Sequence, residues 1–314
     1  MVNNKSIFIT GGTGTLGQSF IKKVLNSYSE VGKITIYSRD EMKQYELGRL
    51  YPSNQYPQIR WVIGDVRDRS RLVSKMAGAD IVIHAAAMKH IPICEENPEE
   101  CIKTNVEGTK NVIFSALENG VKKTVLCSTD KAVDPISIYG NSKEAAEKLF
   151  LNASTASSKF AIIRLGNIWG SRGSVVPLFK ELSKTGVIPI THPDMTRFFC
   201  SESQTTDSLI YALEHMLGGE IFIPKMSSRR IVDIAKEIGP DCAHHVIGLR
   251  GFEKISEKLI TDTEKERTIE NSSYWIVHHN KESVTDYDQL ISAIDQNRLD
   301  SQLANDAHLK YQLN

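Results

Sequence analysis

The stretch STDKAVDPISIYGNSK, residues 128–143, carries two kinds of reactive group in one short segment. Tyr139 and Lys143 are four positions apart, so on a helix they lie one turn apart on the same face. A lysine ammonium and an oxidised nicotinamide both favour the phenolate, which lets a tyrosine act as a base near neutral pH. The spacing therefore predicts a base that deprotonates an alcohol as its hydride leaves. A core tyrosine beside a surface lysine is the competing interpretation.

Asp130 and Lys131 precede this pair and add an acid and a base that simple alcohol oxidation does not need. If Tyr139 oxidises the C4 hydroxyl of a sugar, the new ketone acidifies the C5 proton. Lys131 as base can then remove that proton, while Asp130 as acid helps the C6 hydroxyl to leave as water. Return of the hydride to C6 completes a dehydration without net redox change. Thr129 adds a hydroxyl that can share the hydrogen bonds, and a solvated ion pair at a strand end is the alternative.

A glycine-rich loop, TGGTGTLG at residues 10–17, lies between the first predicted strand and a predicted helix. Glycine permits the tight turn and the close approach of a pyrophosphate, whose charge then faces the helix N-terminus. We predict a dinucleotide site here, although a glycine-rich turn without a ligand remains possible on the motif alone. The loop residues assigned to it are Gly11, Thr13, Gly14, Thr15, Leu16 and Gly17.

The end of the second predicted strand indicates which dinucleotide binds. An NAD enzyme usually has an acid here that holds the ribose 2′-hydroxyl. This chain has Ser38 and Arg39, with Lys43 one turn further on, and these groups suit a 2′-phosphate. We therefore predict NADP. Asp40 keeps NAD as the alternative, and Lys43 is equally compatible with a solvated helix face.

Two further strand ends complete the predicted cofactor site. Asp65 in the GDV motif is placed to meet the adenine, with Val66 beside it, although a strand-end turn would also explain the aspartate. The small side chains of residues 85–87 would let the backbone lie against the cofactor, and close packing is the rival explanation. These three residues are Ala85, Ala86 and Ala87.

Short apolar runs alternate with helical patterns along the first half, which predicts an α/β fold with a Rossmann-type, doubly wound parallel sheet. The strands are expected over 5–10, 33–38, 59–64, 80–85, 123–128 and 159–166, and the helices over 15–28, 40–50, 68–76, 98–119 and 139–156. We place the cofactor domain at 1–170. A smaller substrate-binding lobe, partly interwoven with it, is expected over 171–314, with helices near 174–185, 204–217, 230–238 and 253–260 and a strand at 220–224.

Composition narrows the function classes. Lysine plus arginine equals aspartate plus glutamate at 38 each in 314 residues, which gives no support to a nucleic-acid or membrane partner. No apolar run approaches the ~20 residues of a membrane span, and no signal peptide is evident. The five cysteines form no C-x-x-C pair, so we expect reduced thiols, a cytoplasmic location and no metal site.

The glycine loop and Tyr-x-x-x-Lys resemble the extended short-chain dehydrogenase/reductase superfamily. The 128–143 stretch is more specifically similar to the inverting UDP-N-acetylglucosamine 4,6-dehydratases that begin pseudaminic acid synthesis. Further segments that carry the resemblance, over about residues 5–260, are YSRDEMKQ, GDVRD, HAAAMKHIPICEENPEECIKTNVEGT, GNIWGSRGSVVPLF, MTRFF and GGEIFIPKM. The resemblance implies NADP, catalysis by Asp130, Lys131 and Tyr139, and return of a proton to C5 by Lys131 from the opposite face.

The resemblance also implies contacts with UDP-N-acetylglucosamine, a homo-oligomer and delivery of the product to an aminotransferase. The residues expected to touch or shape the substrate site are Lys89, Asn105, Asn167, Val175, Arg197, Arg250 and Glu253. One departure is GLRGFEK at 248–254, which has Phe252 where the family has glycine. We therefore expect the loop on the uridine side to be reshaped.

Several other functions remain open at this point. A retaining dehydratase, or one that stops at a 5,6-alkene, could use the same residues with different proton delivery. A C4 epimerase needs Tyr139 and Lys143 but no adjacent acid and base, so Asp130 and Lys131 argue against it. A non-catalytic NADP-binding regulator tends to lose the tyrosine, which this chain keeps.

Overall fold

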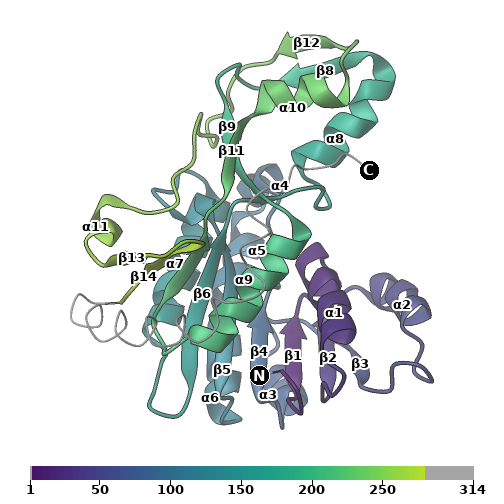
Figure 1. The fold of residues 1–314 in the computed structure, drawn as a ribbon, viewed down its shortest axis with the longest axis vertical. Helices are drawn as coiled ribbons and strands as arrows, with labels where there is room; N and C mark the ends of the chain where they lie inside the picture. Colours follow the sequence, from purple (N-terminus) through teal and green to yellow (C-terminus); the bar gives the residue numbers. More distant parts are fainter. Residues whose placement is uncertain (1, 280–314) are drawn as a thin grey trace.

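The computed structural model describes residues 2–279, and within them the largest element is a nine-stranded sheet (Figure 1). Across the sheet the strands are β13 (Thr268–Glu270), β14 (Tyr274–Val277), β10 (Ile221–Pro224), β6 (Lys159–Leu165), β5 (Lys123–Thr129), β4 (Ile81–His84), β1 (Ile7–Thr10), β2 (Ile34–Ser38) and β3 (Ile59–Ile63). All neighbours from β10 to β3 pair in parallel, and β14 and β13 add antiparallel strands at one edge. This order confirms the predicted fold class and the six predicted strands of the first half.

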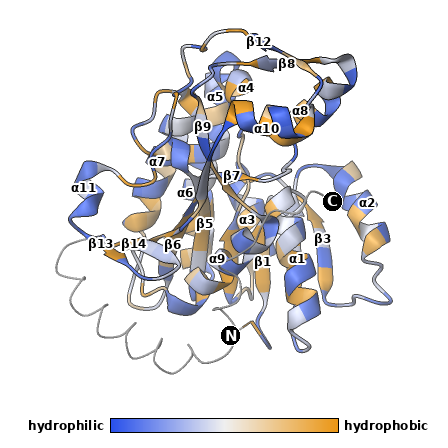
Figure 2. Ribbon diagram, turned by 45° about the horizontal axis from the view of Figure 1, so that its top comes forward, coloured by the Kyte–Doolittle hydropathy of each residue, from blue (hydrophilic) through white to orange (hydrophobic). Residues whose placement is uncertain are grey.

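Helices cover both faces of the sheet and connect its parallel strands (Figure 1). In chain order they are α1 (Thr15–Ser27), α2 (Glu41–Leu50), α3 (Arg69–Met76), α4 (Ile91–Glu96), α5 (Pro98–Ile102), α6 (Gly108–Glu118), α7 (Ile138–Leu151), α8 (Val175–Leu182), α9 (Glu202–His215), α10 (Ile231–Ile238) and α11 (Asp262–Lys265). Figure 2 shows hydrophobic residues along the central strands and hydrophilic ones on α11 at the edge. Burial of both sheet faces explains why the parallel strands are continuous apolar runs.

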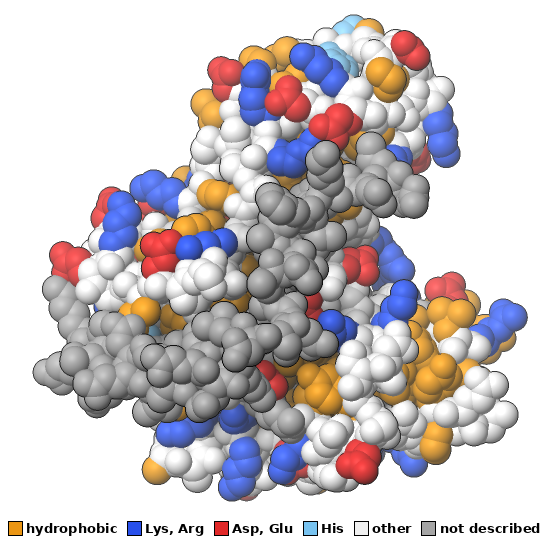
Figure 3. Space-filling view, viewed as in Figure 1, with side chains coloured by type: hydrophobic (Ala, Val, Ile, Leu, Met, Phe, Trp, Pro, Cys, Tyr) orange, Lys and Arg blue, Asp and Glu red, His pale blue; other side chains and the backbone are white. Residues whose placement is uncertain are grey.

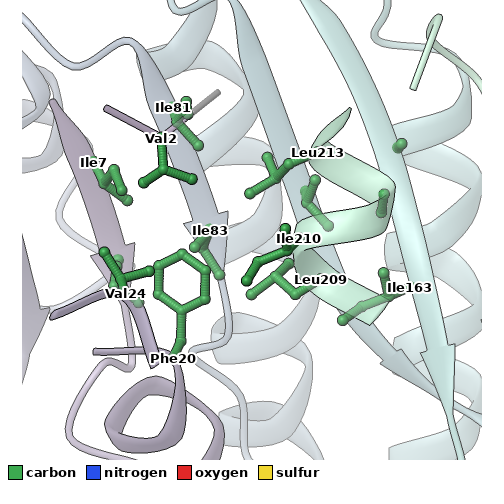
Figure 4. Close-up of a cluster of buried hydrophobic side chains, with 14 of the residues drawn as sticks. Val2, Ile7, Phe20, Val24, Ile81, Ile83, Ile163, Leu209, Ile210 and Leu213 are labelled. Carbon is green, nitrogen blue, oxygen red and sulfur yellow. The ribbon is translucent and has the colours of Figure 1, made fainter. Parts of the chain in front are cut away.

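The core lies in two layers because side chains alternate along each strand. Figure 4 shows one layer, where Phe20 of α1 and Leu209 of α9 pack onto Ile7 and Ile83 of the sheet. Phe8 points the other way, into a second cluster with α3, α6 and α7. Packing in these two layers sets the positions of the helices on the sheet. The N-termini of the helices that follow parallel strands are thereby held near the carboxyl ends of those strands.

A smaller lobe stands above the carboxyl ends of the parallel strands (Figure 1). It contains α8, α10 and a parallel pair formed by β8 (Val187–Ile190) and β12 (Ala243–Val246), around a core that includes Phe179 and Ile234. A second small sheet has β9 (Thr196–Cys200) between β7 (Asn167–Ile168) and β11 (Ser227–Arg230). The chain after residue 170 also supplies α9 and three strands of the large sheet, so it contributes to both parts.

Two helix predictions need correction. The predicted helix over 253–260 is wrong, because that segment is irregular and the carbonyls of Lys254 and Ile255 accept hydrogen bonds from Arg197 instead. The single helix predicted over 98–119 is divided by a π-helical turn, η1 (Lys103–Glu107). Such turns often occur at functional sites because they redirect side chains within a helix.

A buried ion triad fastens α7 to the C-terminal part of the sheet. Arg164 on β6 is 2% exposed and lies 2.6 Å from Glu147 of α7 and 2.9 Å from Glu264 of α11. The guanidinium also donates to the carbonyl of Leu259 at 2.8 Å. Burial opposes the charge, but both carboxylates outweigh it and raise the pKa of Arg164.

Arg164→Met is expected to lower the free energy of unfolding by about 3–5 kcal/mol, because two buried carboxylates would lose their shared counter-ion. Urea unfolding followed by circular dichroism measures this loss. The control, Lys148→Met, removes an exposed pair with Glu144 on the same helix and should cost about 0.5 kcal/mol or less. Equal losses in the two variants would contradict a special role for the triad.

Candidate active site

The segment that joins β5 to α7 brings the predicted catalytic residues together. β5 ends at Thr129, and Asp130 and Lys131 form a 3-10 turn, η2 (Asp130–Ala132), directly after it. The Ser137 hydroxyl then caps α7 by accepting a hydrogen bond from Gly140 N at 3.0 Å. Tyr139 therefore lies in the first turn of α7, beside the turn that carries the acid and the base.

Asp130 and Lys131 form a direct pair in this site. Lys131 Nζ lies 2.9 Å from Asp130 Oδ1 and 3.3 Å from Asn167 Oδ1 on β7, which places Asn167 at the predicted site. The Asp130 side chain is fully buried, and its Oδ2 has no hydrogen-bond partner among residues 2–279. A buried carboxylate oxygen without a partner is available to a ligand, so this pair can give and take protons at a bound molecule.

Thr129 connects the acid to the tyrosine. Its hydroxyl donates to Asp130 Oδ1 at 3.0 Å and also forms a hydrogen bond with the phenol of Tyr139. Burial raises the pKa of Tyr139, and the hydrogen bond with Thr129 only partly offsets this. Burial also lowers the pKa of Lys143, whose Nζ donates to Cys127 O at 2.9 Å. Both shifts arise from removal of water and favour neutral groups, so a bound positive charge is needed to favour the phenolate.

The glycine loop has the close packing that a dinucleotide site requires. Gly11 has φ +66°, and a Cβ there would lie 2.6 Å from Ala86 N. Gly17 allows α1 to approach the loop, since a Cβ would lie 2.4 Å from Gly12 O. Thr13 is buried, whereas Gly14, Thr15 and Leu16 are more open at the start of α1. This cradle lies where the chain reverses between β1 and β4, the position at which doubly wound sheets bind nucleotides.

Two buried threonines hold the segment of residues 85–87 beside that loop. His84 at the end of β4 makes hydrogen bonds with Thr10 at 2.7 Å and with Thr109 at 3.0 Å. Burial, with a smaller effect of the Lys143 charge, lowers the pKa of His84 to about 3, so the ring is neutral. Ala86 N also donates to the Thr10 hydroxyl, while Ala87 is exposed. The segment therefore has one defined position next to the predicted cofactor.

The ends of β2 and β3 lie next to each other at the predicted ribose site. Ser38 is buried and accepts a hydrogen bond from Gln44, whereas Arg39 is exposed and lies 3.6 Å from Asp65. Lys43 pairs with Asp40, the N-cap of α2.

Asp65 is engaged by Arg67 as well as by Arg39. Burial would raise the pKa of Asp65, but hydrogen bonds and charge from Arg67 outweigh it and lower that pKa. Val66, the other predicted residue here, is buried beneath this pair of strand ends. The side chains of Arg39 and Lys43 are 54% and 38% exposed, which leaves both accessible to a phosphate.

The predicted substrate residues divide into two groups by their contacts. Asn105 is buried and binds the backbone of Met88 and the hydroxyl of Ser142, so it shapes the site. Arg197 donates to the carbonyls of Thr196, Lys254 and Ile255, so its guanidinium holds that segment rather than standing free for a diphosphate.

The other group lies at the surface of the smaller lobe and near the glycine loop. Arg250 pairs with Glu253, and its guanidinium lies over the ring of Phe252 at 5.3 Å. In the loop of residues 248–254, the Phe252 ring therefore packs against Arg250. Val175 begins α8 at the edge of the lobe's core. Desolvation, and then the charge of Arg172, lower the pKa of Lys89. Figure 3 shows the surface hollowed between this lobe and the part of the molecule that carries α1 and α2.

Two residues at the site were not found from the sequence. Glu257 lies 3.7 Å from Lys131, and Arg172 N donates to the Thr15 hydroxyl at 3.4 Å. Neither belongs to a motif with its own chemistry, and both lie in irregular segments. A cluster of three or more metal-binding side chains is not found among residues 2–279. None of the helices in that range has the length and apolar character to cross a membrane.

Known proteins resemble this chain over nearly its whole described length. The model of a family described as "Polysaccharide biosynthesis protein" matches residues 7–279. An inverting UDP-N-acetylglucosamine 4,6-dehydratase from Campylobacter jejuni is 46% identical over 88% of this chain and 84% of its own. A UDP-glucose 4-epimerase from Rickettsia conorii is 39% identical over 88% of this chain and 83% of its own.

A solved structure shows the same architecture. The X-ray structure of Pen from Bacillus thuringiensis matches with a TM-score of 0.84 and 35% identity, over 88% of this chain and 87% of that one. The similarity therefore extends over most of the chain.

Proposed function

Because the chain belongs to the family of polysaccharide biosynthesis proteins, we propose that it is an inverting UDP-N-acetylglucosamine 4,6-dehydratase. The product is UDP-2-acetamido-2,6-dideoxy-β-L-arabino-hexos-4-ulose. The observation that carries the proposal is the contact of 2.9 Å between Lys131 and the fully buried Asp130. The Thr129 hydroxyl links this Asp130 to Tyr139. An acid, a base and an alcohol-oxidising tyrosine at one place are what an elimination within a redox cycle needs.

The protons in this reaction connect the two pairs of residues. Tyr139 takes the proton of the C4 hydroxyl, Lys131 takes the C5 proton, and Asp130 gives a proton to the departing C6 hydroxyl, which leaves as water. Lys131 then returns a proton to C5 from the opposite face, which inverts that carbon. A nicotinamide cofactor, held at the loop of Gly11, Gly14 and Gly17, would supply the hydride chemistry between C4 and C6.

After these steps Tyr139 holds one proton more and Asp130 one fewer than at the start. A proton must therefore pass from the phenol to the carboxylate before the next turnover. The Thr129 hydroxyl contacts both groups and offers a route within the buried site. This route needs no exchange with solvent, which the burial of Asp130 restricts.

We further propose that the cofactor is NADP rather than NAD. Support comes from Arg39 and Lys43, two cations on the surface that follows β2. Arg39→Ala is expected to weaken NADP binding by about tenfold while NAD binding changes little, because only NADP has the 2′-phosphate. Calorimetric titration with each dinucleotide measures this, and Arg60→Ala, exposed on β3, is the control. Equal weakening for both dinucleotides would contradict the assignment.

The remaining parts of the proposal are a homo-oligomer, a cytoplasmic location and delivery of the keto sugar to an aminotransferase. The location is supported by five cysteines that all carry free thiols. Delivery to another enzyme is supported by chemistry, since the ketone at C4 is reactive and an amine can condense with it.

The experiment that tests the function is incubation with UDP-N-acetylglucosamine in deuterated water. We expect loss of water by mass spectrometry and an inverted, deuterated C5 by NMR. A deuterated C5 of unchanged configuration would indicate a retaining dehydratase. A C4 epimer of unchanged mass would indicate a 4-epimerase, and a sugar without any change would overturn the enzymatic proposal.

A further inference from the structure

Glu257 lies at the catalytic pair although it comes from a distant part of the chain. Its side chain is 4% exposed, and Oε1 lies 3.7 Å from Lys131 Nζ. The residue belongs to the irregular segment that follows β12, more than a hundred positions after Lys131. Lys131 is therefore held between the carboxylate of Asp130 at 2.9 Å and that of Glu257.

The position of Glu257 is set by a network rather than by a helix. Arg197 donates to the carbonyls of Lys254 and Ile255 at 2.9 and 3.0 Å, and Thr196 N donates to Ile255 O at 2.9 Å. Lys254 Nζ donates to Val133 O at 2.7 Å, which joins the segment to the loop after the catalytic turn. These contacts hold the backbone on which Glu257 is carried.

The charges that face Glu257 are Lys131, Lys254 and Arg197, with Lys254 Nζ at 3.2 Å from Oε2 and Arg197 Nε at 4.0 Å from Oε1. Lys131 is in turn faced by Asp130 and by the amide oxygen of Asn167. Glu257 thus has three cationic groups within 4.0 Å, and one of them is the amine that the proposed reaction uses.

Resting on the proposed function, we infer that Glu257 is a positioning residue that orients Lys131 and stabilises the ammonium formed when Lys131 takes the C5 proton. A carboxylate near a developing cation, in a site with little water, lowers the energy of the charged state. The same ion pair, at 3.7 Å, also attracts Nζ toward the side of the site on which Glu257 lies. Asp130 cannot do this alone, since it must also give its proton to the C6 hydroxyl.

The test uses exchange at C5 of the keto sugar product, supplied in deuterated water with the full-length protein and its cofactor. This exchange needs the base but no hydride transfer, so it reports on Lys131 alone. In Glu257→Gln we expect the maximal exchange rate to fall by about tenfold. Because the variant lacks the anion at position 257, the acid limb of the pH profile of exchange should also move to lower pH by about one unit.

Two further variants separate charge from structure. Glu257→Asp keeps the charge and should keep the acid limb near its wild-type pH, even if the rate falls. Glu270 on β13 forms a surface ion pair with Lys225. Glu270→Gln should match the wild type in both the exchange rate and the position of the acid limb. Binding of UDP-N-acetylglucosamine, measured by calorimetry, should be unchanged in Glu257→Gln.

The results distinguish this inference from the proposed function. A wild-type protein that does not dehydrate UDP-N-acetylglucosamine overturns both. A wild-type protein that dehydrates it, with a Glu257→Gln variant whose acid limb stays in place, overturns the inference alone. If Glu257→Gln is not folded, Glu257→Asp provides the test. An acid limb that moves by as much as about one pH unit in Glu257→Asp would overturn the inference about Glu257.

Discussion

Replacing Lys131 by methionine is expected to lower the dehydration rate by roughly 10²- to 10⁴-fold, the range that a positioned proton-transfer group contributes. Methionine preserves much of the length of the side chain but cannot accept the C5 proton. Oxidation at C4 depends on Tyr139 and Lys143, so this half-reaction should still occur. We therefore expect reduced cofactor to accumulate in a single turnover, with no deuterium entering C5 from deuterated water.

Absorbance of the reduced nicotinamide and NMR at C5 measure these two effects together. The matched control is Lys258→Met, which removes an exposed lysine that pairs with Asp134 in the loop after the catalytic turn. It should retain both dehydration and exchange. Exchange at C5 that persists in Lys131→Met would show that another group is the base.

Tyr139→Phe is expected to lower the dehydration rate by a similar factor, roughly 10²- to 10⁴-fold, but at a different step. Phenylalanine fills the same buried space and lacks the oxygen that accepts the C4 hydroxyl proton. Reduced cofactor should therefore not accumulate. Exchange at C5 of the supplied keto sugar should remain, because the ketone is already present and Lys131 is intact.

The contrast between these variants separates the two halves of the reaction. Lys131→Met should lose C5 exchange and keep hydride transfer. Tyr139→Phe should lose hydride transfer and keep C5 exchange. Tyr45→Phe, on the exposed face of α2, is the control for loss of a phenol. Loss of C5 exchange on the keto sugar in Tyr139→Phe would contradict a separate base.

Local sequence signals were sufficient for the parts of the site that lie on regular elements. The apolar runs that became β1, β2, β4, β5 and β6 are buried on both faces, and their pattern follows directly from that burial. The edge strand β3 is partly exposed. The glycine loop and Tyr139 with Lys143 have fixed spacing, because a strand, a turn and a helix must follow one another there. Asp130 and Lys131 adjoin these motifs, so their place at the strand end was predictable.

The part of the site that comes from residues 247–261 could not be predicted in the same way. Its hydrophobic pattern over 253–260 resembles a helix, but Arg197 and Thr196 donate hydrogen bonds to its carbonyls. Its Lys254 side chain donates in turn to Val133 O. Those partners are distant in sequence, and tertiary contacts outweigh local propensity. Glu257 was missed for this reason, since only the fold brings it to Lys131.

The π-helical turn and the edge of the large sheet were missed for related reasons. Asn105 lies in η1, where its amide binds Met88 and Ser142, and nothing in the local spacing distinguishes such a turn from a regular helix. β13 and β14 are short antiparallel strands that join the sheet only because β10 offers a free edge. Pairing of this kind depends on the assembled fold.

We propose that Tyr139 and Lys143 run a redox cycle within which Asp130 and Lys131 eliminate water. The most direct measurement uses UDP-N-acetylglucosamine that carries deuterium at C4, with NMR and mass analysis of the product. We predict loss of water and transfer of the deuterium to C6 of the same sugar molecule. Deuterium that remains at C4 of a sugar with its water retained, in either configuration, would contradict the claim.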